Sequence, residues 1–321
     1  MNKLNITFYV FLILSCTGSP SEPVINDEGI LQKHWNTPIN LIDTPDTTPL
    51  VVEDLIIYSG ERDLVALDIT SGAKLWSYEI GEGRALNSCY ISYDKQKGQV
   101  FFSHDEDFRV LDIKSGELIL QIKNIVHPCG SHQRVPQGYA VVGDTTDGYL
   151  VDFDGTIRRE VNLSMGTASI EYSNNKLYFA QVETVNGALT KGRIYAMDLM
   201  NGDSLWAYNT DYGGFHWAKP VIENGILYAG TYGNSPTKLF MALDIEAGEP
   251  VWEYITQDPY FSTKFFAIGK QNLFVSSSIM LIALDKKTGQ RMWDFKWTSS
   301  TGVQPVYLEG FVYASDYNRI F

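Results

Sequence analysis

The sequence is poor in the residue types that most often carry metal or haem chemistry. Its 321 residues include only three cysteines and five histidines. The cysteines, Cys16, Cys89 and Cys129, lie far apart, so no Cys-x-x-Cys-His haem-attachment motif is formed. No two histidines have the His-x-x-x-His spacing of a helical metal site. Both absences argue against a metalloenzyme or a haem enzyme.

Positive charge is scarce as well. Lysine and arginine number 25 against 38 aspartates and glutamates, which gives a net charge of −13. Such a surface repels nucleic acid and anionic lipid. The sequence also lacks a Gly-x-Ser-x-Gly nucleophile elbow and a phosphate-binding loop. We therefore expect no nucleic-acid partner, no catalytic residue, no cofactor and no metal ion.

Long apolar runs are absent, and the longest near the N-terminus is only Phe8–Leu14. This run follows a weakly positive start and is too short to span a bilayer, which favours a signal peptide. Its end, Leu14-Ser15-Cys16, resembles a bacterial lipobox, although Leu14 stands where a smaller residue is usual. We expect residues 1–15 to be a lipoprotein signal peptide, Cys16 to be lipidated, and residues 16–31 to be a flexible tether. The alternative is ordinary cleavage beside an incidental cysteine.

The lipobox also predicts where in the cell the protein is located. Thr17 follows the cysteine where retention in the inner membrane would favour aspartate, so the resemblance implies an outer-membrane lipoprotein of the cell envelope, facing the periplasm or the cell surface. The lipid anchor would then be its only contact with the membrane.

A repeated pattern of alanine, aspartate, glycine and tryptophan dominates the rest of the chain. Its clearest copy is Ala283-x-Asp285, followed by Gly289 and Trp293. Copies recur at intervals of 40 to 46 residues, at Asp68, Asp112, Asp152, Asp198, Asp244 and Asp285. A period of this length with short apolar strands is typical of β-propeller blades.

Each residue of the pattern has a mechanical reason. Aspartate accepts hydrogen bonds from its own turn, and glycine adopts a positive φ at little cost. The tryptophan can bury roughly 200 Å² against the neighbouring blade. The copy at Asp112 has Leu120 at the tryptophan position, and the copy at Asp152 is shortened. These residues are therefore interpreted as fold determinants rather than as a catalytic set.

The pattern resembles the PQQ-like β-propeller repeat over residues 47–321. That family includes quinoprotein dehydrogenases and cofactor-free propellers such as the BamB-like outer-membrane assembly lipoproteins. The dehydrogenases carry a vicinal cysteine pair beneath the quinone and eight blades, and this sequence has no vicinal pair. The resemblance therefore implies the cofactor-free branch, without enzymatic activity.

The fold class we predict is all-β: a single, monomeric propeller of seven four-stranded antiparallel blades over residues 32–321. The last blade lacks its outer strand after Phe311–Phe321. Trp35 precedes Trp76 by one repeat length, so we expect Gln32–Asn40 to supply that strand and to close the ring. The alternative is an incomplete chain with an eighth blade missing.

Two clusters near the predicted inner strands allow further hypotheses. An exported protein meets an oxidising compartment, so a disulfide between Cys89 and Cys129 is one hypothesis. His127, Cys129 and His132 are close in sequence, and they are interpreted as channel-lining residues rather than as metal ligands.

A partner-binding surface is expected on the face that carries the connections between blades and the loops between second and third strands. Two such loops, 183–191 and 231–238, are longer than their counterparts. Aromatic residues on rigidly mounted loops are typical of interaction hot spots. The candidate partner-binding residues are Tyr212, Phe215, His216, Trp217, Tyr232, Tyr260 and Phe261. For Phe215 and Trp217 the alternative is that they pack in the core.

The function predicted from these features is a lipid-anchored protein-interaction scaffold. The resemblance implies an envelope protein as the partner, with the barrel-assembly machinery as the specific candidate. The alternative is a ligand- or carbohydrate-binding propeller, or a degenerate PQQ-dependent dehydrogenase-like protein.

Overall fold

The computed structural model describes fourteen stretches of the chain, and in them the backbone forms strands and turns without a helix. The stretches are 4–9, 33–39, 49–60, 62–81, 91–104, 106–125, 131–143, 146–185, 188–215, 219–232, 237–257, 265–277, 280–296 and 304–314. No helix in these stretches has the length and apolar character needed to cross a membrane.

The strands form six four-stranded antiparallel sheets, which we call blades one to six, and two two-stranded sheets. The first compact unit holds β1 (Leu4–Tyr9), β2 (Lys33–Ile39), β3 (Leu50–Val52), β4 (Leu55–Ser59), β5 (Asp63–Asp68), β6 (Lys74–Glu79), β7 (Ser92–Asp94), β8 (Gln99–His104), β9 (Asp107–Asp112) and β10 (Leu118–Ile122). Residues 106–108 of this stretch cluster instead with the second unit.

The second unit holds blades three to six and a final hairpin. Its strands are β11 (Ser131–Val135), β12 (Gly138–Val142), β13 (Asp147–Asp152), β14 (Ile157–Asn162), β15 (Gly166–Ser173), β16 (Lys176–Val185), β17 (Ala188–Asp198), β18 (Ser204–Thr210), β19 (Val221–Glu223), β20 (Ile226–Gly230), β21 (Lys238–Asp244), β22 (Pro250–Thr256), β23 (Phe265–Ile268), β24 (Asn272–Ser276), β25 (Met280–Asp285), β26 (Arg291–Lys296), β27 (Val306–Leu308) and β28 (Phe311–Tyr313).

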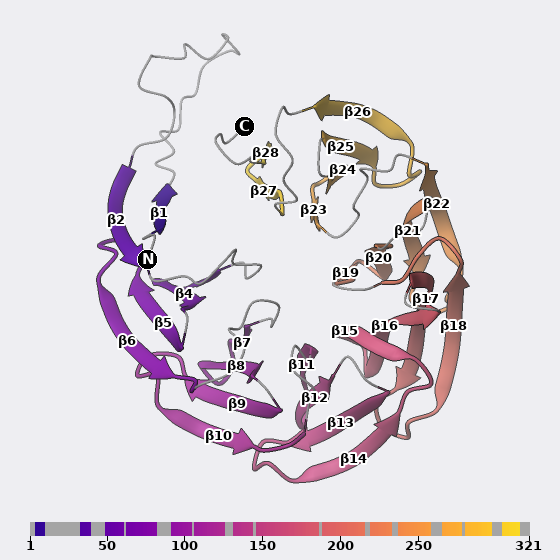
Figure 1. The fold of residues 1–321 in the computed structure, drawn as a ribbon. Coiled ribbons are helices and arrows are strands. Elements are labelled where there is room, and N and C mark those ends of the chain that lie inside the picture. The colour runs from indigo at the N-terminus through magenta and orange to yellow at the C-terminus, as the bar shows by residue number, and fades with distance from the viewer. Residues whose placement is uncertain are drawn as a thin grey trace, which may run out of the picture. The chain divides into compact units, whose positions relative to one another are not determined.

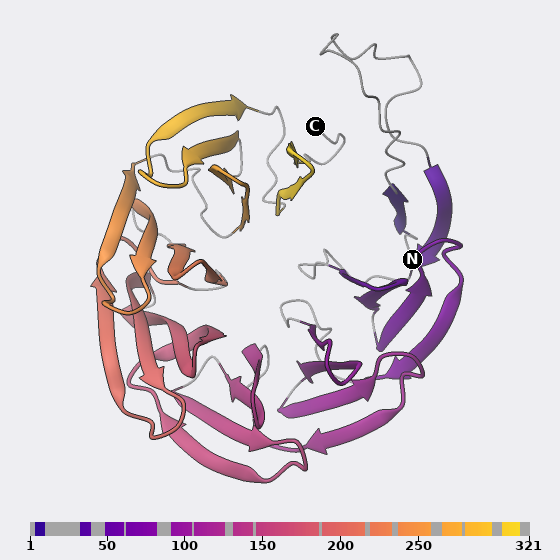
Figure 2. The same ribbon diagram turned by 180° about the vertical axis from the view of Figure 1, so that it is seen from behind.

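Every blade is a meander in which consecutive strands pair. In the second unit, successive blades stand side by side, with first strands on the inner side and fourth strands on the outer side (Figures 1 and 2). The middle strands are apolar on both faces because each is covered by a neighbouring blade. In β21, for example, every residue from Lys238 to Leu243 is buried. The outer strands are more exposed: in β6 and β22 the tryptophan is the buried residue, and every residue of β26 is exposed.

The turn predicted for the repeat is confirmed. In blade five, Asp244 Oδ1 accepts hydrogen bonds from the backbone N–H groups of Glu246 at 2.8 Å and Ala247 at 2.9 Å. The N–H of Gly248, at φ 71°, donates to the carbonyl of Asp244. The same aspartate-to-backbone bonds recur in the turns that begin at Asp68, Asp112, Asp198 and Asp285.

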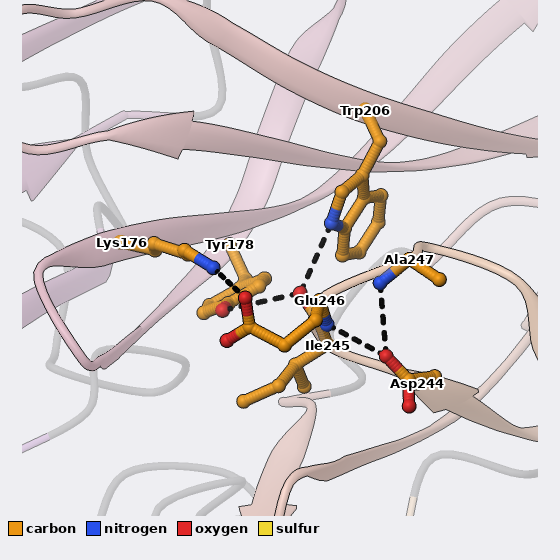
Figure 3. Close-up of polar contacts among 7 residues, drawn as sticks. All are labelled: Lys176, Tyr178, Trp206, Asp244, Ile245, Glu246 and Ala247. Atoms are coloured by element: carbon orange, nitrogen blue, oxygen red, sulfur yellow. Dashed lines mark hydrogen bonds and ion pairs between the residues drawn. The ribbon is translucent and has the colours of Figure 1, made fainter.

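Three of the four repeat tryptophans, Trp76, Trp206 and Trp252, pack on the next blade, as predicted. Trp206 of blade four donates its Nε1–H to the carbonyl of Ile245 in blade five at 3.0 Å (Figure 3). Its ring lies on Gly248, where a Cβ would come within 2.3 Å of Trp206 Cδ2. Equivalent hydrogen bonds run from Trp76 to Ile113 at 2.9 Å and from Trp252 to Lys286 at 3.0 Å. The repeat therefore specifies a contact between neighbouring blades, in which the tryptophan ring of one blade packs on the turn glycine of the next.

Blade three uses arginine where blades one, four, five and six use tryptophan. Arg159 lies four residues after Gly155, the same spacing that separates Gly202 from Trp206. Its guanidinium donates to the carbonyl of Met200 at 2.9 Å, and a Cβ on Gly202 would lie 2.6 Å from Arg159 Nη1. The planar guanidinium thus occupies the place of the indole and keeps the hydrogen bond to the next blade.

The turn carboxylates predict an acid limit to stability. The pKa values of Asp68 and Asp285 are lowered from 3.8, chiefly by side-chain hydrogen bonds from Ser71 and Thr288. A carboxyl whose pKa is lower in the folded than in the unfolded state stabilises the protein above its unfolded pKa. This stabilisation is lost as the pH falls through the folded pKa. We expect the midpoint temperature of thermal unfolding to fall as the pH is lowered below about 4. The Asp285→Asn variant should show a smaller fall over the same pH range. An unchanged pH profile in the variant would contradict this role.

The expected ring closure is not tested by the described strands. The segment around Trp35 does form a strand, β2, and it pairs antiparallel with β1, with Phe8 opposite Trp35. At the other end, β27 and β28 form a hairpin, and residues 315–321 lie outside the described residues. Pairing of Gln32–Asn40 with the last blade therefore stays a prediction, as do the signal peptide and the tether.

Candidate functional site

The connection between blades four and five is tied to the loop between the second and third strands of blade five. The backbone of Gly214 pairs with Tyr232, whose N–H donates to the Gly214 carbonyl at 2.8 Å. Thr231, which is buried, donates its Oγ1–H to the carbonyl of Tyr212 at 2.9 Å. The two loops expected to share a face are therefore joined by hydrogen bonds.

The long loop predicted at 183–191 is instead mostly strand. β16 and β17 extend as a hairpin, in which Glu183 pairs with Lys191 and Val185 with Ala188. Val182, Thr184 and Val185 are β-branched, and such residues favour a strand. The hairpin packs directly on the blade connection, since a Cβ on Gly192 would lie 2.6 Å from the carbonyl oxygen of Gly213. A Cβ on Gly214 would likewise lie 2.3 Å from Val182 Cγ2.

Tyr212 and Tyr232 are the predicted partner-binding residues that this arrangement presents at the surface. Tyr212 is 36% exposed, and its backbone is fixed at both the N–H and the carbonyl, by Thr210 and Thr231. Tyr232 is partly exposed. We call the surface formed by these two tyrosines and the β16–β17 hairpin the loop face. A tyrosine whose main chain is already held in place loses less conformational entropy when it binds a partner.

The prediction that Phe215 binds a partner is wrong. Its side chain is completely buried in a cluster with Tyr178, Ile194 and Leu239, and its N–H donates to the carbonyl of Gln181 at 3.3 Å. The physical reason is the close approach of the blade-four hairpin, which covers the ring once the connection has turned at Gly213 and Gly214. Of the two interpretations of Phe215, the packing one holds.

The other candidate residues lie outside the described residues and stay predictions. These are Cys16, Cys89, Cys129, His216, Trp217, Tyr260 and Phe261. Of the histidine and cysteine cluster, His132 is described, and it is buried on β11 with its ring 5.9 Å from that of Phe108. Within the described stretches, no group of three or more histidine, cysteine, aspartate or glutamate residues has a geometry that could hold a metal ion.

A polar cluster on the inner strands was missed from the sequence. Glu171 on β15 pairs with Lys219 at 3.1 Å, and Gln133 on β11 donates to its carboxylate at 3.2 Å. Burial raises the pKa of Glu171, against the opposing effect of Lys219. The three residues come from three blades, so no local pattern predicts that they meet. Their mutual pairing makes the cluster a link between blades rather than an open binding site.

The repeated meanders, with their aspartate turns and tryptophan contacts, define a β-propeller whose repeat resembles the PQQ-like repeat. Residues 190–318 match the family described as outer membrane protein assembly factor BamB. The outer membrane protein assembly factor BamB of Yersinia pestis is 30% identical over 132 residues, which cover 40% of this chain and 31% of the relative. The match thus spans about a third of the relative's length.

Two solved structures share the fold. The crystal structure of BamB from Moraxella catarrhalis superposes with a TM-score of 0.58 at 15% identity, over 83% of this chain and 78% of that one. A europium-containing methanol dehydrogenase superposes with a TM-score of 0.61 at 14% identity, over 87% and 75% of the two chains. Identities this low speak for the fold alone. The chain is therefore a β-propeller, and its residues 190–318 are similar to the BamB family.

Proposed function

We propose that this propeller is a non-enzymatic scaffold of the cell envelope that binds an envelope protein through its loop face. The observation that carries the proposal is the exposed Tyr212 beside Tyr232, on backbone that Thr210, Thr231 and Gly214 hold in place. Tyrosine on a rigid mount combines a large apolar area with a polar tip, which is typical of interaction hot spots. His216, Trp217, Tyr260 and Phe261 are proposed to enlarge the same surface.

Similarity to an outer membrane protein assembly factor supports the barrel-assembly machinery as the partner. In this proposal, Cys16 carries the lipid, residues 1–15 are removed as the signal, and residues 16–31 tether the propeller to the outer membrane. The tether would reach at most about 50 Å if fully extended.

The fold is shared with a methanol dehydrogenase, so an enzymatic alternative has to be weighed. The sequence has no vicinal cysteine pair of the kind that the resemblance associates with quinone binding. Absence of enzymatic activity is therefore part of the proposal, and a catalytic role would need residues other than those brought together at the loop face.

The proposal predicts that substituting both tyrosines weakens partner capture. We expect Tyr212→Ala with Tyr232→Ala to reduce the envelope protein recovered with the propeller from solubilised membranes by roughly tenfold or more, because each hot-spot aromatic contributes about 1 to 2 kcal/mol. Tyr172→Ala is the matched control, since this partly exposed tyrosine lies near the end of β15, beside the β15–β16 turn at the other end of blade four. Equal capture by the double variant and the wild type would refute the assignment of the loop face.

A further inference from the structure

A cleft of about 550 Å³ opens between blades five and six, on the side of the aspartate turns. Its blade-five wall is apolar and aromatic, with Tyr228 and Trp252 at its base, and both rings belong to the core shared by the two blades. Its blade-six wall comes from two turns, which contribute Lys270, Lys286 and Lys287. Three lysines around one apolar cleft stand out on a chain of net charge −13.

The preceding junction shows what normally occupies this place. Between blades four and five, Lys176 forms an ion pair with Glu246 across the junction, beside Tyr178 (Figure 3). Lys176 is the first residue of the second strand, and Glu246 is the second residue after the turn aspartate. Acid and base thus close this junction from opposite sides.

The same two positions cannot pair between blades five and six. The first residue of β20 is Ile226, and the second residue after Asp285 is Lys287. An isoleucine offers no charge to the ammonium group, so the bridge that covers Tyr178 has no counterpart over Tyr228. The substitution of the pair by Ile226 and Lys287 explains both the opening and its positive rim.

The acidic side chains near the cleft, Glu223 and Asp285, already have partners within the chain. Glu223 forms an ion pair with Lys286, which also donates to the carbonyl of Gly269 at 3.2 Å. Asp285 Oδ1 accepts from the N–H groups of its own turn, at 3.0 Å from Lys287 and 2.8 Å from Thr288. Within the described residues, Lys270 and Lys287 form no ion pair, and both are exposed. Their charges therefore face the solvent at the edge of the cleft.

We propose that this cleft binds an acidic segment of a partner protein, with a carboxylate at Lys270 and Lys287 and an adjacent apolar side chain against the wall of Tyr228 and Trp252. Charge complementarity selects the carboxylate, because it restores the acid that Glu246 supplies at the preceding junction. The apolar wall selects a neighbouring hydrophobic residue, since burying it removes further area from water. This cleft is separate from the loop face, so the proposal does not depend on partner binding by Tyr212 and Tyr232.

The test measures the anisotropy of fluorescein-labelled peptides with the full chain at 0.15 M salt. The probes are acetylated Phe-Glu-Phe-Glu and its Phe-Gln-Phe-Gln counterpart. We expect the acidic peptide to bind at least roughly tenfold tighter than the amide peptide, because the amides lack the charge that the lysines attract. Equal binding of the two peptides, or no binding of either, would overturn the proposal.

Three variants locate the binding. Lys270→Ala with Lys287→Ala should weaken the acidic peptide roughly tenfold. Ile226→Glu should also weaken it, by giving Lys287 a partner within the chain. Lys114→Ala is the matched control, because Lys114 has the position of Lys287 in the turn of blade two, and it should leave affinity unchanged. Thermal midpoints within a few degrees of wild type establish that each variant folds. If all three variants bind like the wild type, the peptide docks elsewhere and the assignment fails.

Discussion

Gly248→Ala is expected to lower the free energy of unfolding by about 2 to 5 kcal/mol, the sum of two separate penalties. The first is the left-handed backbone at φ 71°, which costs a residue with a Cβ about 1 to 2 kcal/mol. The second is overpacking, because the new Cβ would lie 2.3 Å from Trp206 Cδ2 and the indole has to move. Overpacking in a tight core adds about 1 to 3 kcal/mol.

Gly225 of the same blade separates these two penalties. Its φ is 80°, yet a Cβ there meets nothing within 4 Å. Gly225→Ala should therefore show the backbone cost alone, about 1 to 2 kcal/mol. Denaturant unfolding of both variants, followed by Trp fluorescence, gives the comparison. Equal losses for the two would mean that the glycine is required for its conformation only, and that the tryptophan contact contributes nothing.

Trp252→Ala is expected to cost about 3 to 5 kcal/mol, as aromatic truncations in a core do. The side chain is only 8% exposed, packs with Tyr228 and Phe240, and satisfies the carbonyl of Lys286. Truncation leaves a cavity between two blades and a carbonyl without its donor.

Trp293 provides the control for that substitution, because it has the same place in the repeat. It is 40% exposed and contacts Phe274 with ring centres 5.8 Å apart. We expect Trp293→Ala to cost about 1 kcal/mol, since an exposed side chain loses little burial. Both free energies come from the same denaturant titration. A loss for Trp293→Ala as large as that for Trp252→Ala would show that burial of the indole between blades is not what stabilises the repeat.

The repeat made most of the blade structure predictable from sequence. Aspartate, glycine and tryptophan each act within a few residues or through a fixed spacing, so the turns of five copies and the outer strand Lys74–Glu79 fall where the pattern puts them. The position of Arg159 between blades was also predictable, because it lies four residues after Gly155 just as Trp206 follows Gly202. The residue type concealed this equivalence, because arginine and tryptophan are chemically different and only the contact with the next blade shows that one replaces the other.

The candidate site was predicted less completely, because it depends on contacts between segments far apart in sequence. Phe215 sits in an aromatic loop, and only the neighbouring hairpin decides that it is buried. The pairing of Glu171 with Lys219 joins two blades, and neither residue lies in a motif. Tyr212 and Tyr232 could be assigned to one face because propeller topology alone brings their loops to the same end of the blades.

Photo-cross-linking in intact cells tests most directly whether a partner binds at the loop face. A benzoyl-phenylalanine at position 212 or 232 is compared with one at position 172, and the adducts are identified by mass spectrometry. We expect positions 212 and 232 both to cross-link to the same envelope protein and position 172 not to. Adducts from 172 alone, or none from either 212 or 232, would contradict it.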